Sequence, residues 1–271
     1  MDAIRLGPFV LSVPVLLVLA AILAASALAG WFRRRGAGAA PDASSALWTM
    51  LAAGFVSARA VFVLRHHDLF LDKPWTAFDI RDGGFDGPTG LLVACVVGAE
   101  LTRRQAALRR PLLASVLAGC AVWLGGTLLS QAFAPAHAPL PELTVRRLDG
   151  SEAPLSSFAG KPMVVNLWAT WCPPCRREMP ALAAAQRAHP EVAFVFVNQG
   201  ESAEAVARFL AAQGLRMQNV VLDPAARLAA HTGSPGYPAT LFYDARAVLR
   251  ARHVGELSEA TLRDRLAALR R

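Results

Sequence analysis

The chain has 271 residues, of which 54% are hydrophobic and 18% are charged. This length allows one to two domains, and so apolar a composition excludes an ordinary soluble protein. The net charge of +8 comes mainly from arginine. The arginines flank apolar segments and do not gather on one aromatic-rich surface, so the charge indicates a membrane protein and argues against nucleic-acid binding.

Apolar runs of membrane-spanning length fill the first half of the chain. Crossing a hydrocarbon core of ~30 Å takes about 20 apolar residues. We predict an all-α membrane domain over residues 1–134, with about four segments at 8–32, 46–64, 88–101 and 112–133, the third being short. Three arginines at 33–35 follow the first run, whereas a cleaved signal peptide carries its positive charge before its apolar stretch. We therefore expect an uncleaved first helix.

Positive charge sets the predicted orientation in a bacterial inner membrane. The loops after the first and third segments carry seven arginines, whereas the loop at 65–87 has three basic and five acidic residues. Short arginine-rich loops stay in the cytoplasm, so residue 134 and everything after it is expected outside. Arg59, inside the second segment, either snorkels or faces the bundle interior. The mixture of His66, His67 and aspartates at 65–87 fits either a solvated loop or a metal site.

A proline-rich linker at 135–141 precedes a domain at 142–271 in which strand and helix patterns alternate. We predict strands at 143–148, 162–168, 192–198, 220–222, 240–243 and 248–254, and helices at 173–189, 202–213, 225–231 and 258–269. This order is typical of an α/β fold with a central mixed sheet flanked by helices.

The strongest motif of the chain is the sequence Cys-Pro-Pro-Cys at 172–175, which follows a strand-like apolar run and opens a helical pattern. A thiolate at Cys172 would lie near the unpaired backbone N–H groups and the positive end of the helix dipole. Two intervening residues let the sulfurs of Cys172 and Cys175 meet across one turn. Redox chemistry is therefore predicted; a static disulfide or a zinc half-site is the alternative, although zinc usually needs a second ligand pair.

The segment Trp-Ala-Thr-Trp-Cys-Pro-Pro-Cys-Arg-Arg-Glu-Met-Pro at 168–180 resembles the TlpA/ResA/DsbE family of membrane-tethered thiol-disulfide oxidoreductases. The segment Gly-Tyr-Pro-Ala-Thr-Leu-Phe at 236–242 supports this resemblance. In that family the second motif has a cis proline, here Pro238, which faces the active-site disulfide. The resemblance covers residues 140–271 and implies a thioredoxin-like fold.

Specific roles follow for the site residues. Cys172, more exposed in this layout, is expected to attack, and Cys175 to resolve the mixed disulfide. The resemblance assigns Glu178 a pKa-tuning and proton-accepting role, with an exposed helix acid as the alternative. Tyr237 and Pro238 would align an extended substrate. Trp171 and Trp168 either shape the substrate surface or pack inside the domain.

The buried acid of cytosolic thioredoxins is replaced here by Asn166, so that proton route is absent. We expect no cofactor and no metal at the site.

The expected activity is reduction of protein disulfides outside the cytoplasm, as in cytochrome c maturation, with electrons from a membrane carrier of the CcdA/DsbD type. A thiol oxidase of the same fold is the alternative within this class. From other classes, a lipid-modifying transferase with an accessory redox domain and a copper- or zinc-binding module also remain.

The membrane part has a resemblance of its own. The segments at 4–9, 57–59 and 82–91 resemble the N-terminal half of prolipoprotein diacylglyceryl transferase. That family has a His-Gly-Gly-Leu element where this chain has Pro88, Thr89, Gly90 and Leu91, so the histidine is missing. Its later helices are replaced by the dithiol domain. The resemblance therefore implies a retained membrane scaffold without transferase activity.

Two further cysteines fall in the predicted membrane segments. If the third and fourth segments were antiparallel neighbours, Cys95 and Cys120 would lie at similar depths, ~9 Å and ~12 Å from the cytoplasmic ends. A membrane dithiol that relays electrons is then possible. The alternative, which we expect, is that both are small apolar helix residues.

Overall fold

The computed structural model describes residues 3–6, 9–35, 42–71, 74–133, 139–234 and 236–269. Contacts between residues divide the chain into two compact units, one with most of residues 11–134 and one with residues 135–271. Most of the expected cytoplasmic linker at 36–45 and of the linker at 135–141 lies outside the described residues. Each unit is described by itself.

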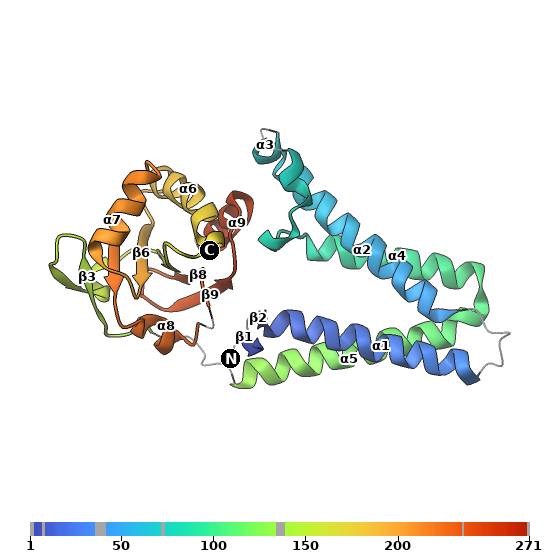
Figure 1. Ribbon diagram of the computed structural model, residues 1–271. Helices are drawn as coiled ribbons and strands as arrows, with labels where there is room; N and C mark the ends of the chain where they lie inside the picture. Colours follow the sequence, from blue (N-terminus) through green and yellow to red (C-terminus); the bar gives the residue numbers. More distant parts are fainter. Residues whose placement is uncertain are drawn as a thin grey trace. The chain divides into compact units, whose positions relative to one another are not determined.

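The first unit is built from two helix pairs. Its long helices are α1 (Val13–Arg35), α2 (Ala43–Arg65), α4 (Gly87–Arg104) and α5 (Arg109–Phe133). Helix α1 packs along α5, and α2 packs along α4, as Figure 1 shows. A Cβ atom on Gly54 would lie 2.8 Å from the carbonyl oxygen of Gly90, so the α2–α4 pair depends on glycine for its close approach.

The other elements that precede α5 in the chain are short. They are β1 (Ala3–Leu6), β2 (Phe9–Ser12), α3 (His67–Phe70) and 3₁₀ turns at Pro74–Phe78, Ile80–Asp82 and Ala106–Leu108. The expected start of the first membrane helix at residue 8 is wrong, because β2 occupies the beginning of that apolar run. The helix starts at Val13, with Pro14 in its first turn, where a missing N–H costs little.

Three helices of the described residues are long and apolar enough to cross a membrane, within Val15–Arg35, Ala43–Arg65 and Ala106–Ser130. The shorter α4 is helical as predicted but does not belong to this group. Arg59 on α2 is buried, and its guanidinium donates hydrogen bonds to the carbonyl oxygens of Thr76, Ala77 and Gly84. It therefore faces the interior of its unit, which decides between the two orientations considered above.

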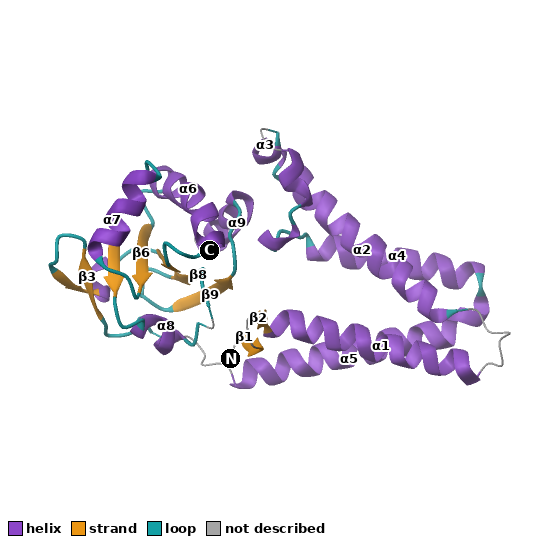
Figure 2. Cartoon of the chain, viewed as in Figure 1, coloured by secondary structure: helices purple, strands orange, loops and turns teal. Residues whose placement is uncertain are grey.

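The second unit contains a seven-stranded mixed sheet in the order β4-β3-β7-β6-β5-β8-β9 (Figure 2). Its strands are β3 (Thr144–Arg147), β4 (Glu152–Pro154), β5 (Met163–Trp168), β6 (Ala193–Gln199), β7 (Val220–Asp223), β8 (Ala239–Tyr243) and β9 (Leu249–Val254). The three central strands β7, β6 and β5 are parallel, and the strands on either side run antiparallel to them. The short β4 was not predicted.

Helices cover both faces of this sheet. They are α6 (Pro173–Ala188), α7 (Ala203–Ala212), α8 (Arg227–Thr232) and α9 (Glu259–Leu269), with a 3₁₀ turn at Leu155–Phe158. Alternate residues of a strand point to opposite faces. Accordingly Val164 and Trp168 of β5 join the core under α6, α7 and α9, whereas Val165 and Leu167 join the core under α8. The predicted thioredoxin-like α/β fold is confirmed.

Candidate active site

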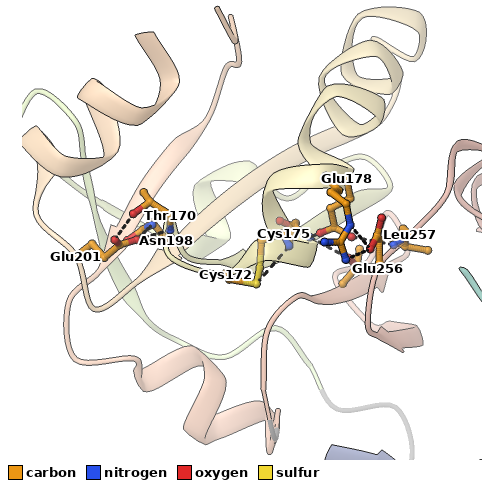
Figure 3. The surroundings of a disulfide bond; sticks show 11 residues. Thr170, Cys172, Cys175, Glu178, Asn198, Glu201, Glu256 and Leu257 are labelled. Atoms are coloured by element: carbon orange, nitrogen blue, oxygen red, sulfur yellow. Dashed lines mark hydrogen bonds and ion pairs between the residues drawn. A yellow bond between two sulfur atoms is a disulfide. The ribbon is translucent and has the colours of Figure 1, made fainter. Parts of the chain in front are cut away.

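The dithiol lies where β5 ends and α6 begins. Cys172 is the N-cap residue of α6, and its Sγ accepts a hydrogen bond of 3.3 Å from the backbone N–H of Cys175. Pro173 and Pro174 fill the first helical positions, where a backbone N–H is not needed. The two cysteines form a disulfide with a Cα–Cα distance of 5.3 Å (Figure 3). This cap geometry stabilises negative charge on Cys172 Sγ once the disulfide opens.

The two cysteines differ little in exposure in this oxidised state. Cys172 is 3% exposed and Cys175 is fully buried. The two nearby tryptophan side chains differ much more in exposure, since Trp171 is 65% exposed whereas Trp168 is completely buried. A surface role for Trp168 is therefore wrong: it packs in the core, while Trp171 stands at the surface.

Glu178 lies one helical turn after Cys175 and is buried. Its Oε1 accepts a hydrogen bond of 2.8 Å from Asn166 Nδ2, and its Oε2 accepts one of 2.9 Å from the backbone N–H of Leu257. Burial raises the pKa of Glu178 to about 8, and the two hydrogen bonds oppose that rise. The alternative of an exposed helix acid is thus excluded.

Asn166 connects this acid to the neighbouring strand. Its Nδ2 also donates to the hydroxyl of Thr240 at 3.0 Å, and Asn166 and Thr240 are cross-strand partners on β5 and β8. Arg177, the neighbour of Glu178, pairs with Glu256, the neighbour of Leu257. The loop before α9 is therefore fixed to α6 at two adjacent residues, which holds the buried carboxyl in place.

The second motif lies against the same strand. The peptide bond between Tyr237 and Pro238 is cis. Ala239, the next residue, pairs with Leu167 of β5, so the proline lies at the end of the strand that leads into the dithiol. The ring of Tyr237 meets that of Trp171 edge-on with centroids 6.0 Å apart. Two aromatic side chains from the two motifs thus stand together beside the cysteines.

A third group of residues at the site was not foreseen from the sequence. Thr170, in the loop before Cys172, and Asn198, at the end of β6, both donate hydrogen bonds to Glu201. Figure 3 shows this group on the opposite side of the disulfide from Glu178. Glu201 is 31 residues from Thr170, and a single acid in a loop after a strand gives no pattern that would have revealed it.

The two remaining cysteines do not meet as neighbours. Cys95 lies on α4 and Cys120 on α5, and both are exposed and free. The main helix contacts pair α4 with α2 and α5 with α1, so the third and fourth segments lie in different helix pairs. Among the described residues, no group of three histidine, cysteine or acidic side chains is placed to hold a metal ion.

A sheet with a cysteine-capped helix, a disulfide at that cap and a cis proline at the end of the adjoining strand is typical of a thiol-disulfide oxidoreductase of thioredoxin-like fold. Residues 135–269 match the Redoxin family, and residues 2–128 match the prolipoprotein diacylglyceryl transferase family. The second match supports the membrane part of the chain.

Individual relatives narrow the class. The thiol:disulfide interchange protein DsbE of Pseudomonas fluorescens biotype C is 34% identical over 131 residues, which cover 48% of this chain and 72% of that protein. The thiol-disulfide oxidoreductase ResA of Halalkalibacterium halodurans is 30% identical over 152 residues, which cover 54% of this chain and 86% of that protein. The chain belongs to the DsbE/ResA family of thiol-disulfide oxidoreductases.

Among solved structures, a secreted Mycobacterium tuberculosis disulfide oxidoreductase homologous to E. coli DsbE is similar to this chain. It is 29% identical, and the match covers 47% of this chain and 96% of that one, with a TM-score of 0.43.

Proposed function

We propose that the protein is a membrane-anchored reductase of disulfides in extracytoplasmic proteins, and that the Cys172–Cys175 dithiol supplies the electrons. The observation that carries this direction is the burial of Cys175 and Glu178 together. Residues three apart on a helix are neighbours on one face. A buried thiol beside a buried acid is costly to ionise, so the disulfide form is favoured over the ionised dithiol. A dithiol that favours its own oxidation is a reductant.

The proposed reaction has two exchange steps. The Cys172 thiolate attacks one sulfur of a substrate disulfide, a mixed disulfide forms, and the other substrate sulfur leaves as a thiolate that takes up a proton. The Cys175 thiolate then attacks Cys172 Sγ, which releases the second substrate sulfur as a thiol and closes the Cys172–Cys175 disulfide. Two electrons pass to the substrate, and a dithiol donor must restore the reduced enzyme.

Glu178 is proposed to take the proton from Cys175 in the second step. Burial brings the pKa of Glu178 from 4.5 to about 8, which is nearer to that of a thiol, whose ordinary value is ~8.5 and which burial raises further. Proton transfer between groups of similar pKa costs little free energy, which suits a general base. The hydrogen bonds from Asn166 and Leu257 keep the acceptor oxygens in place between turnovers.

Substrate is proposed to bind across Trp171, Tyr237 and Pro238. Pro238 has no backbone N–H, while an extended substrate segment pairs with the backbone of Tyr237. The exposed Trp171 ring and the half-buried Tyr237 ring give this segment an apolar contact next to the attacking sulfur. An extended, locally unfolded polypeptide such as an apocytochrome fits such a surface.

The proposed domains are a membrane domain at 1–134, a linker at 135–141 and a redox domain at 142–271 that is extracytoplasmic. The arginine-rich loops support this topology in a bacterial inner membrane, and the topology requires α4 to cross the membrane in addition to the three candidate spans. A membrane carrier of the CcdA/DsbD type is the proposed donor. A reporter phosphatase fused after Arg271 should be active and one fused after Arg35 inactive; the reverse pattern would refute the topology.

Trapping tests the function directly. In a full-length Cys175→Ser variant, the mixed disulfide on Cys172 cannot be resolved, so substrate proteins should accumulate on Cys172 and mass spectrometry should identify them. The Cys172→Ser/Cys175→Ser variant is the matched control and should trap nothing. If instead the intact Cys172–Cys175 disulfide oxidises substrate dithiols to disulfides, and its measured potential is that of an oxidant, the enzyme is a thiol oxidase.

A further inference from the structure

Glu201 is bound to the loop that carries the attacking cysteine by a set of short hydrogen bonds. Its Oε2 accepts from the backbone N–H of Thr170 at 2.7 Å and from Asn198 Nδ2 at 2.7 Å, and its Oε1 accepts from the Thr170 hydroxyl at 2.5 Å. Hydrogen bonds to an ionised carboxylate are roughly twice as strong as neutral ones. We call these three residues the Glu201 clamp.

The sheet explains why residues so far apart meet. Strands β5 and β6 are parallel, with Trp168 opposite Asn198, so the segments that follow both strands leave the same edge. Gly200 then has a φ of 79°, a left-handed conformation that glycine adopts at little cost. This turn places Glu201 beside Thr170 and not further along the direction of β6.

The clamped loop holds both reactive and binding groups. Thr170 is followed directly by the exposed Trp171 and by Cys172, whose backbone N–H bonds back to the carbonyl oxygen of Ala169 at 3.3 Å. Because both the N–H and the side chain of Thr170 are fixed, the backbone that leads into Trp171 and Cys172 has little freedom. The separation of Trp171 from Tyr237 depends on this backbone.

We propose that Glu201 is a positioning residue for thiol–disulfide exchange: through Thr170 it holds Cys172 Sγ and the Trp171 ring in the arrangement that accepts a substrate disulfide. This inference rests on the proposed reduction at Cys172. It assigns the two acids on opposite sides of the disulfide to separate tasks (Figure 3). Glu178 exchanges a proton with Cys175, whereas Glu201 sets the geometry of the loop before Cys172.

Three variants of the full-length chain in detergent separate this role from charge alone. Glu201→Ala removes all three hydrogen bonds. Glu201→Gln keeps them, because its Oε1 accepts from both N–H donors and its Nε2 donates to the Thr170 hydroxyl, which also accepts. Glu204→Ala is the matched control, since it removes the same charge from a nearby exposed residue whose side chain bonds to Ser202.

The measurement is kcat/KM for reduction of insulin disulfides, with the thermal unfolding midpoint of each variant recorded alongside. Wild-type activity that is lost in Cys172→Ser is established first, so a failure of the proposed function shows at that step. Glu201→Ala should then be about tenfold slower, in line with the cost of misplacing a reacting group. Glu201→Gln should recover to within about threefold of wild type, and Glu204→Ala should match wild type.

Three outcomes would overturn the inference: a wild-type rate in Glu201→Ala, an equal loss in Glu201→Gln, or an equal loss in Glu204→Ala. If Glu201→Ala does not fold, Thr170→Val replaces it, because it removes only the hydroxyl bond and keeps the backbone N–H bond. Thr170→Val should be about two- to threefold slower, as expected for one lost hydrogen bond. A wild-type rate in this variant would equally reject the clamp.

Discussion

The two units of this chain differ in where they place their large apolar side chains. In the membrane unit, the large apolar side chains of α1, α2 and α5 point outward, as Leu23 and Leu128 do, and the contacts between helices are made through small residues such as Gly54 and Ala29. In the redox unit, apolar residues fill two cores, one on each face of the sheet. The exposed apolar side chains of the first unit suit lipid surroundings, in which helices associate through small residues, whereas the second unit must bury its own apolar side chains.

This difference also explains where each unit keeps its buried polar groups. Arg59 in the membrane unit donates to three backbone carbonyl oxygens in the hydrogen bonds described above. Glu178 in the redox unit is satisfied by an amide side chain and a backbone N–H. The first arrangement surrounds a permanently charged guanidinium with acceptor oxygens, and the second surrounds a carboxyl group whose pKa burial raises to about 8.

The largest expected effect is the loss of disulfide reduction when the redox unit loses its attacking thiol. Cys172→Ser should abolish insulin disulfide reduction by the full-length chain, because the thiolate at the N-cap of α6 is the only proposed attacking group. Its far-ultraviolet circular dichroism should stay at the wild-type level. Cys95→Ser in the membrane unit is the matched control and should keep full activity. Full activity in Cys172→Ser would contradict the assigned nucleophile.

The next effect concerns the pH dependence of the redox unit in its oxidised state. The pKa of Glu178 is raised from its ordinary value of 4.5 to about 8, so between those values the folded protein binds more protons than the unfolded one. The unfolding free energy should therefore fall as pH rises through this window, by up to about 1.4 kcal/mol for each unit of pKa shift.

Denaturant titrations at several pH values measure this slope. Glu178→Gln cannot ionise and should remove most of the slope between pH 5 and 8, whereas the exposed Glu204→Gln should retain it. A slope that is unchanged in Glu178→Gln would show that another group controls the pH dependence.

A smaller effect should be confined to the membrane unit. Gly54→Leu places side-chain atoms against the backbone of Gly90 and should destabilise the α2–α4 pair by about 1–3 kcal/mol. Gly30→Leu is the control, because a Cβ there would have no atom within 4 Å. Limited proteolysis of full-length protein should show faster cleavage near α2 and α4 in Gly54→Leu, with insulin reduction unchanged. Equal cleavage of both variants would contradict the glycine contact.

The smallest expected effect is that of removing Cys95 and Cys120, which tests whether the membrane unit carries electrons through its own thiols. Cys95 and Cys120 lie on helices of different pairs, so we expect the Cys95→Ala/Cys120→Ala variant to keep its reducing function in cells. The redox state of Cys172 and Cys175, read by thiol labelling, should match wild type. Accumulation of the oxidised pair at an unchanged protein level would show that the membrane cysteines form a relay.

Local sequence patterns were sufficient to predict many of the helices and strands of this protein and the position of its dithiol. Apolar runs predicted helices α1, α2 and α5 because a membrane span needs only a continuous stretch of about 20 apolar residues. The β5–Cys172–α6 junction was predicted because strand, N-cap and proline signals all lie within about a dozen residues. The two motifs, and the family resemblance that they carry, also predicted Tyr237, Pro238 and Glu178 as site residues without a fold.

Only the tertiary structure decided the features that depend on residues distant in sequence. The contact of Glu178 with the backbone N–H of Leu257, 79 residues away, forms only in the folded domain, where burial raises the pKa of Glu178. Trp168 is buried because its side chain points from β5 into the core under α6, α7 and α9, whereas Trp171 lies in the loop after β5 and is exposed. The pairing of α4 with α2, and of Glu201 with Thr170, depends on helix order and strand register. Sequence periodicity records which face of an element is apolar but not which element covers it.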